Sequence, residues 1–154
     1  MRNPLNLPWL KRSQPLAPLA WIVASVLTWR LALAVIGWWT DSQLPYTPSF
    51  PYAGELLIQH SLPSWVTKWA SFDGVHYLTI MQRGYMGTGL IQAFFPVFPL
   101  TVILLAGSTS ATNLITTGLL LNLVLAIYLA WIAHRLLRLE MAEESTRWGV
   151  LALF

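Results

Sequence analysis

The sequence predicts an all-α integral membrane protein, a multi-spanning bundle of helices, and three observations support this class. Hydrophobic residues make up 56% of the chain and charged residues only 10%, whereas soluble domains carry about 25% charged residues. The nine tryptophans suit a membrane–water boundary, where indole rings are enriched. Two apolar runs, residues 16–39 and 114–137, exceed the roughly 20 residues that a helix needs to cross a bilayer core.

The first predicted span, residues 16–39, reads LAPLAWIVASVLTWRLALAVIGWW. A basic start followed by an apolar run is also typical of a signal peptide. This run is longer than the apolar region of a signal peptide, and it ends in bulky tryptophans where a cleavage site has small residues. We therefore expect an uncleaved membrane anchor.

Arg30 lies well inside this span, where an arginine costs roughly 2.5–3.5 kcal/mol. It either extends to an interface or faces other helices or a wet cavity, where it meets an anion. We favour the second interpretation, because charged residues inside membrane spans are mostly functional.

Residues 40–91 form the predicted extracytoplasmic first loop, which carries short interfacial helices. Prolines exclude one long helix in its first half, and they stand at Pro45, Pro48, Pro51 and Pro63. Residues 63–83 are predicted to be helical, in one or two pieces, with an aromatic stripe beside a polar face. Arg83 followed by Gly84 predicts the end of this helix.

Residues 92–107 are the predicted second span, and a fourth span begins at 147–154. Because the last apolar run, RWGVLALF, has barely begun where the sequence stops, we expect residues 1–154 to be the N-terminal part of a single, longer membrane domain. The positive-inside rule favours a cytoplasmic N-terminus and also a cytoplasmic loop at 138–147, which three full crossings cannot satisfy. Either the second segment is a re-entrant hairpin or that loop lies outside.

The composition argues against several classes of site. The chain has no cysteine, so it has no disulfide, thiolate metal site or cysteine nucleophile. The carboxylates Asp41, Glu55 and Asp73 lack any short metal-ligand spacing, and no phosphate-binding glycine motif occurs. No stripe of Lys and Arg indicates nucleic acid as a partner. We therefore expect neither a metal nor a cofactor.

The side chains able to do chemistry concentrate between Phe72 and Pro99, in FDGVHYLTIMQRGY and AFFPVFPL. Asp73 is either a general base for a hydroxyl or the N-cap of the helix, and the sequence favours neither. His76 either donates to a phosphate or orients Asp73, or it packs at an interface. Arg83 either binds a phosphate or complements the helix dipole, and we favour the dipole.

The aromatic side chains of this stretch allow a similar choice. For Tyr77 and Tyr85, interfacial packing is more common than catalysis. The phenylalanines form a cluster that is either the wall of a lipid-chain groove or ordinary core packing: Phe94, Phe95 and Phe98. Asp73 therefore has the strongest claim to a chemical role.

This stretch resembles the signature of the PIG-V-like mannosyltransferases, which belong to the GT-C fold of multi-spanning membrane glycosyltransferases. The shared pattern is an aromatic residue before Asp73, then His76, an aromatic residue, a glycine–tyrosine pair and a phenylalanine–proline run. The similarity covers about residues 16–105 and is best at 72–99, with Phe72 where the family often has Trp.

The resemblance implies transfer of mannose or another hexose from a polyprenyl (dolichyl) phosphate to a glycolipid or glycan acceptor, with inversion and without a metal or cofactor. Asp73 would act as the general base. The remaining site residues would bind the sugar or the lipid phosphate: His76, Arg83, Arg30, Tyr77 and Tyr85. The implied location is a bacterial plasma membrane, or the endoplasmic reticulum membrane in a eukaryote. Because family members have many more spans, we expect this segment alone to be inactive.

Two other functions stay open on the sequence. A non-catalytic scaffold subunit would need the membrane anchors Trp65 and Trp69 rather than Asp73. A transporter component would use Arg30 and Asp73 along an ion or substrate path.

Overall fold

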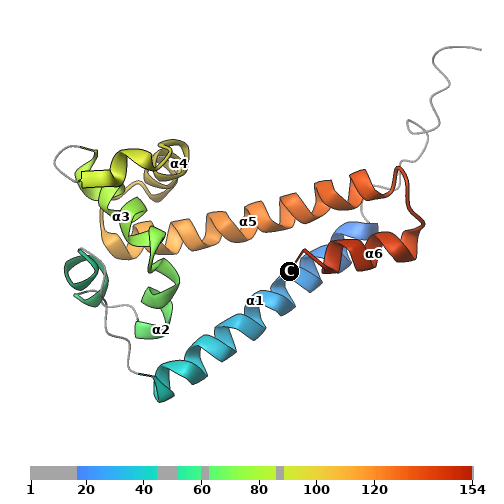
Figure 1. Cartoon of the computed structure of the whole chain (residues 1–154), viewed down its shortest axis with the longest axis horizontal. Coiled ribbons are helices and arrows are strands. Elements are labelled where there is room, and N and C mark those ends of the chain that lie inside the picture. The colour runs from blue at the N-terminus through green and yellow to red at the C-terminus, as the bar shows by residue number, and fades with distance from the viewer. Residues whose placement is uncertain (1–16, 45–51, 60–62, 86–88, 154) are drawn as a thin grey trace, which may run out of the picture. The chain divides into compact units, whose positions relative to one another are not determined.

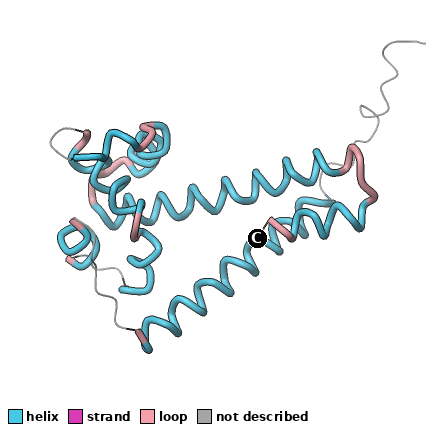
Figure 2. The backbone as a smooth tube through the Cα atoms, viewed as in Figure 1, coloured by secondary structure: helices cyan, strands magenta, loops and turns pink. Residues whose placement is uncertain are grey.

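The structure, a computed structural model, describes residues 17–44, 52–59, 63–85 and 89–153. Every regular element in these ranges is a helix, and no strand occurs in them (Figures 1 and 2). The predicted all-α class is therefore confirmed for the described residues. The elements are α1 (Ala17–Gln43), η2 (Gly54–Ile58), α2 (Ser64–Thr67), η3 (Lys68–Ala70), α3 (Asp73–Arg83), η4 (Gly89–Ala93), α4 (Val97–Ala106), α5 (Ala111–Leu137) and α6 (Glu143–Leu151).

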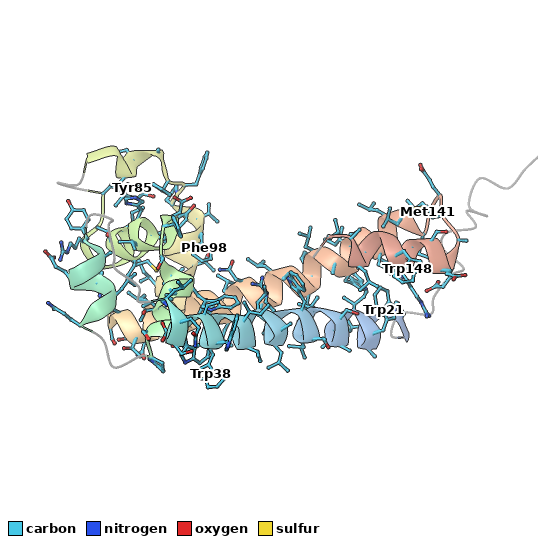
Figure 3. All side chains as sticks on the ribbon, turned by 60° about the horizontal axis from the view of Figure 1, so that its bottom comes forward. Trp21, Trp38, Tyr85, Phe98, Met141 and Trp148 are labelled. Carbon is cyan, nitrogen blue, oxygen red and sulfur yellow. The ribbon has the colours of Figure 1, made fainter. Side chains whose placement is uncertain are left out.

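Among the described elements, α1 from Pro18 onward and α5 are long and apolar enough to cross a membrane. Their 26 and 27 residues give a length of about 40 Å at 1.5 Å per residue, which exceeds a hydrocarbon core of about 30 Å. Only 11% and 17% of their most apolar windows are buried, whereas a core helix of a soluble protein is mostly buried. Apolar side chains such as that of Trp38 project outward from α1 (Figure 3). The two helices contain most of the spans predicted at 16–39 and 114–137, but α1 continues to Gln43 and α5 begins at Ala111.

Helix α4 is shorter than the second span predicted at 92–107. It has ten residues, about 15 Å at 1.5 Å per residue, which is about half the thickness of a bilayer core. Pro96 is its N-cap, and Gly107 ends it in a left-handed conformation with φ 58°. The Gly107 N–H donates to the Ile103 carbonyl at 3.1 Å. Because these residues bound the helix, α4 does not make a straight crossing.

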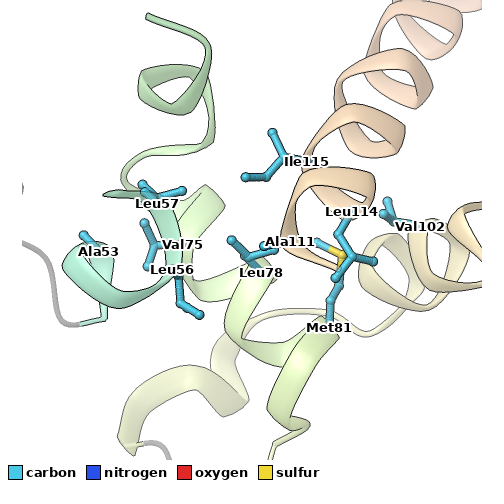
Figure 4. Close-up of a cluster of buried hydrophobic side chains, with 10 residues drawn as sticks. All are labelled: Ala53, Leu56, Leu57, Val75, Leu78, Met81, Val102, Ala111, Leu114 and Ile115. Carbon is cyan, nitrogen blue, oxygen red and sulfur yellow. The ribbon is translucent and has the colours of Figure 1, made fainter. Parts of the chain in front are cut away.

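The chain divides into two compact units, named here the central unit (residues 32–125) and the terminal unit (residues 1–31 and 126–154). In the central unit, η2, α3, α4 and α5 contribute to one hydrophobic core (Figure 4). Its buried side chains are Ala53, Leu56, Leu57, Val75, Leu78, Met81, Val102, Ala111, Leu114 and Ile115.

This core contacts α3 through Val75, Leu78 and Met81. At 100° per residue, Val75 and Leu78 lie opposite Asp73 and His76 around the helix. Val75 is fully buried and Leu78 is 1% exposed, whereas the Asp73 side chain is exposed. The packing therefore fixes the helix while Asp73, its first residue, stays exposed.

The terminal unit contains the first half of α1, the end of α5 and all of α6. Its buried apolar side chains are Ile22, Val26, Ala130 and Val150. Helix α6 approaches α5 closely, because a Cβ atom added to Gly149 would lie 3.0 Å from the Cδ1 of Leu137. This helix begins at Glu143, ahead of the fourth span predicted at 147–154, and its acidic first turn suits the helix dipole.

Glu143 lies at the centre of a charged cluster in the terminal unit. Its carboxylate oxygens lie 3.0 Å from Arg138 Nη1, 3.5 Å from Arg147 Nε and 3.6 Å from His134 Nε2. His134 is 4% exposed, and its ring meets that of Trp21 edge-on at 5.8 Å between centroids. Burial raises the pKa of Glu143, but Arg138, His134 and Arg147 outweigh it, so this pKa lies below its ordinary value of 4.5.

The stability of the protein is therefore expected to depend on Glu143 at acidic pH. Since the pKa is lowered in the folded state, the contribution of Glu143 is complete above 4.5 and is lost as the pH falls through the folded pKa. In detergent, the unfolding temperature of the wild type should fall more steeply over this range than that of Glu143→Gln. Glu144→Gln, which changes the exposed neighbour, should keep the wild-type slope. Equal slopes for wild type and Glu143→Gln would contradict this role.

Candidate functional site

A tight turn places Asp73 at the start of α3. The Gly74 N–H donates to the Ser71 carbonyl at 3.1 Å, and Phe72 between them has φ 56° and ψ −124°. A β-turn with a positive φ at its second residue is type II′, in which glycine is usual. The helix N-cap is Phe72, without a side-chain cap bond, so the N-cap interpretation of Asp73 is wrong. As the first helical residue, Asp73 still interacts favourably with the helix dipole.

Asp73 differs from the other carboxylates of the predicted first loop in its ion pairing. The loop contains the carboxylates Asp41, Glu55 and Asp73, and its Lys and Arg residues are Lys68 and Arg83. Lys68 forms an ion pair with Asp41, and Arg83 Nη2 lies 2.8 Å from Glu55 Oε2. The exposed Asp73 carboxylate makes no hydrogen bond or ion pair within the described residues. Both cations of the loop are therefore engaged by other carboxylates.

The pair of Lys68 and Asp41 fastens the end of α1 to the short helices α2 and η3. The Ser64 hydroxyl also donates to Asp41, and Lys68 Nζ donates to the Leu44 carbonyl at 3.4 Å. Sequence reasoning considered Asp41 only as a metal ligand and missed Lys68. The sequence did contain a signal. The loop has only two Lys or Arg residues and three carboxylates, so each of these cations was expected to pair with a carboxylate.

Arg83 does not share a site with Asp73. The two residues occupy opposite ends of the 11-residue α3, about 15 Å apart at 1.5 Å per residue. The Arg83 guanidinium lies 5.6 Å from the centroid of the Tyr52 ring, in addition to its ion pair with Glu55. As a cation in the last turn it complements the helix dipole, which agrees with the favoured interpretation of this residue.

His76 lies one turn along α3 from Asp73, on the same face. Its half-buried ring packs against Phe94, with 5.1 Å between the ring centroids and 34° between the planes. In the part of the chain that the structure describes, the ring nitrogens make no hydrogen bond. Packing therefore positions the ring and leaves its nitrogens available to a ligand beside Asp73.

Phe94, from the segment AFFPVFPL, contacts side chains of the preceding segment FDGVHYLTIMQRGY. The Tyr77 ring meets Phe94 and Phe98 edge-on, at 5.1 and 5.3 Å between centroids. The Tyr85 hydroxyl donates to the Phe94 carbonyl at 2.7 Å, and Figure 3 labels Tyr85 and Phe98 in this region. These contacts give Tyr77 a packing role and Tyr85 a tethering role. Phe94 is the partner of His76 and of both tyrosines, a role that the predicted phenylalanine cluster did not include.

An apolar groove of about 70 Å³ runs beside this aromatic cluster. Its lining residues are Trp69, Ala70, Gly74, Tyr77, Leu78, Met81, Phe98, Leu114, Ile115, Gly118, Leu119 and Asn122. Of the three predicted phenylalanines, Phe98 lines this groove and Phe94 packs among the rings. Phe95 is 81% exposed. The predicted cluster is therefore divided between groove, packing and outer surface.

Arg30 belongs to the terminal unit, whereas the other candidate residues belong to the central unit. It is half-buried in α1, and its Nε makes no hydrogen bond within the described residues. Among the described residues, the geometry thus places Asp73 and His76 on one face of α3, with Tyr77 beside them one turn from Asp73.

No family model, curated protein or solved structure matches the chain. Fold and site together define an all-helical protein with two helices long and apolar enough to cross a membrane, and with an exposed carboxylate at the start of α3. Within the described residues, no group of three His, Cys, Asp or Glu side chains is placed to hold a metal ion.

Proposed function

We propose that the protein is a membrane glycosyltransferase, most specifically a mannosyltransferase, which takes its sugar from a polyprenyl or dolichyl phosphate. The observation that carries this proposal is the exposed carboxylate of Asp73, which makes no ion pair or hydrogen bond among the described residues, in a loop whose other carboxylates both have cationic partners. A carboxylate without a counterion, held at a helix start, is available to accept a proton from a bound hydroxyl.

The proposed reaction is a single displacement. Asp73 takes the proton of an acceptor hydroxyl as the oxygen attacks the anomeric carbon of the donor sugar. The bond between that carbon and the phosphate oxygen breaks, and the lipid phosphate leaves with the electron pair. Attack on the face opposite the leaving group inverts the configuration at the anomeric carbon.

The leaving phosphate needs hydrogen-bond donors or cations that stabilise its charge. His76 is the best-placed candidate, because it shares the Asp73 face and its nitrogens are available within the described residues. Arg83 is the weaker candidate, since it stands at the far end of α3 and is paired with Glu55. Arg30 stays a candidate because its Nε has no hydrogen-bond partner in the described part of the chain.

The test is a transfer assay in membranes that contain the protein at its natural length. Labelled mannosyl-phosphoryl-polyprenol serves as donor, and the labelled glycolipid or glycan product is separated and counted. Transfer that depends on the protein and is lost in Asp73→Ala supports the proposal. Solute flux into liposomes without sugar transfer would favour the transporter, and the absence of both activities would favour the scaffold subunit.

A further inference from the structure

His134 is a buried polar residue of the terminal unit that lacks a hydrogen bond. It is 4% exposed, and neither Nδ1 nor Nε2 has a hydrogen-bond partner within the described residues. Its ring packs edge-on against Trp21, a contact that leaves both nitrogens unpaired. Buried polar groups in proteins are almost always hydrogen-bonded, because burial without a partner costs free energy. The two nitrogens therefore indicate a polar partner from outside the described part of the chain.

Two guanidinium groups converge on the place that His134 faces. Arg138 Nη1 lies 3.0 Å from Glu143 Oε2, and Arg147 Nε lies 3.5 Å from Glu143 Oε1. His134 Nε2 faces the same Oε1 at 3.6 Å, which is longer than a hydrogen bond. Two cations share one carboxylate, which leaves an excess of one positive charge. The side chains of Arg138 and Arg147 are 30% and 56% exposed, so a ligand reaches them from outside.

The cluster lies at the end of a helix long enough to cross a membrane. The 27 residues of α5 span about 40 Å, against about 30 Å for the hydrocarbon core. A helix centred in the bilayer therefore places its last turn, which holds His134, among the lipid headgroups. Trp21, labelled in Figure 3, lies in the second turn of α1 and packs 5.9 Å from the Arg147 guanidinium. The exposed Glu140 and Glu144 make no ion pair among the described residues.

We propose that this cluster binds the phosphate of an anionic phospholipid. The phosphate replaces the carboxylate of Glu143, whose side chain is 45% exposed, and accepts hydrogen bonds from Arg138, Arg147 and a ring N–H of His134. Glu143 thus holds the two arginines in place and competes with the lipid for them. The site lies in the terminal unit and does not depend on the proposed sugar transfer.

The first arm of the test compares two lipids with the same acyl chains, dioleoyl phosphatidylglycerol and dioleoylglycerol, which lacks the phosphate. The protein at its natural length, in detergent micelles, should bind the phospholipid at least about 10-fold more tightly. Arg138→Gln should weaken phospholipid binding about 10-fold and leave dioleoylglycerol binding unchanged. Arg135→Gln is the matched control and should change neither, because Arg135 is an exposed arginine of the same helix that packs on Trp131.

The second arm separates lipid binding from stability. His134→Phe keeps a ring against Trp21 and removes both nitrogens. It should weaken phospholipid binding about 3- to 10-fold, while the unfolding temperature without lipid stays at or above that of the wild type. Glu143→Gln should tighten phospholipid binding about 3- to 10-fold, because the competing side chain loses its charge.

Equal binding of the two lipids by the wild type would overturn the proposal. Unchanged phospholipid binding in Arg138→Gln, or weaker binding in Glu143→Gln, would overturn it too. If His134→Phe lowers the unfolding temperature and leaves lipid binding unchanged, His134 has a structural role and the proposal is wrong. Glycerol phosphate that binds as tightly as the phospholipid would assign the site to a soluble phosphate compound and refute the lipid assignment.

Discussion

Replacement of Asp73 by Asn is expected to lower kcat for sugar transfer by about 10²- to 10⁴-fold, the usual contribution of general base catalysis. The amide has the size of the carboxylate but does not take up the proton of the acceptor hydroxyl. The KM for the donor should change little, because the lost interaction belongs to the transition state. Initial rates with labelled lipid-linked sugar, in membranes with matched protein levels, measure both constants.

The other carboxylates of the loop provide the controls for this prediction. Glu55→Gln removes an exposed ion pair with Arg83, a kind of interaction that contributes about 0–1 kcal/mol. Its rate should stay close to that of the wild type. A normal rate in Asp73→Asn would refute the base assignment. A loss of similar size in Glu55→Gln would refute it too, because a general requirement for loop charge would then explain both results.

Replacement of Leu78 by Ala is expected to destabilise the protein by about 2–5 kcal/mol, as deletion of a buried leucine side chain usually does. Leu78 is 1% exposed and belongs to the core that holds α3. Loss of its side chain leaves a cavity. It also weakens the packing of α3 against this core on the side opposite Asp73 and His76. Chemical or thermal unfolding in detergent measures the effect.

Leu104→Ala is the matched control, since Leu104 is an apolar helix residue with 82% exposure. Substitution there should change the free energy of unfolding by less than about 0.5 kcal/mol. Equal destabilisation by the two variants would show that α3 is not held by this core. Leu78→Ala should also lower sugar transfer, because a mobile α3 no longer holds Asp73 in one place.

Much of the helical framework could be predicted from local sequence. The apolar runs at 16–39 and 114–137 form α1 and α5, since only their length and hydropathy matter for that assignment. The end of α3 was also predicted, and it falls at Arg83, with Gly84 beyond it at φ 71°. Residues 63–83 form a helix in pieces, as expected, because the chain turns at Ser71 and Phe72.

Other features depended on contacts that no local pattern encodes. The second span was predicted at 92–107, but α4 has only ten residues. The helix begins after its N-cap Pro96 and ends before Gly107, although the residues before Pro96 are also apolar. Whether Asp73 is the N-cap or the first helical residue depended on the φ of Phe72. A phenylalanine in the sequence does not indicate a positive φ. Sequence-based propensity would place phenylalanine in the opposite region of φ.

The candidate site shows the same division. The sequence alone identified Asp73 and His76 as neighbours, because a spacing of three residues places side chains on one helix face. The sequence alone also determined that a chain this apolar forms helices suited to lipid. Only the tertiary structure decided that Lys68 and Arg83 pair with other carboxylates and leave Asp73 free of cations among the described residues. Charge pairing depends on distances between elements far apart in the chain, such as α1 and η3 for Asp41 and Lys68, and tertiary packing sets these distances.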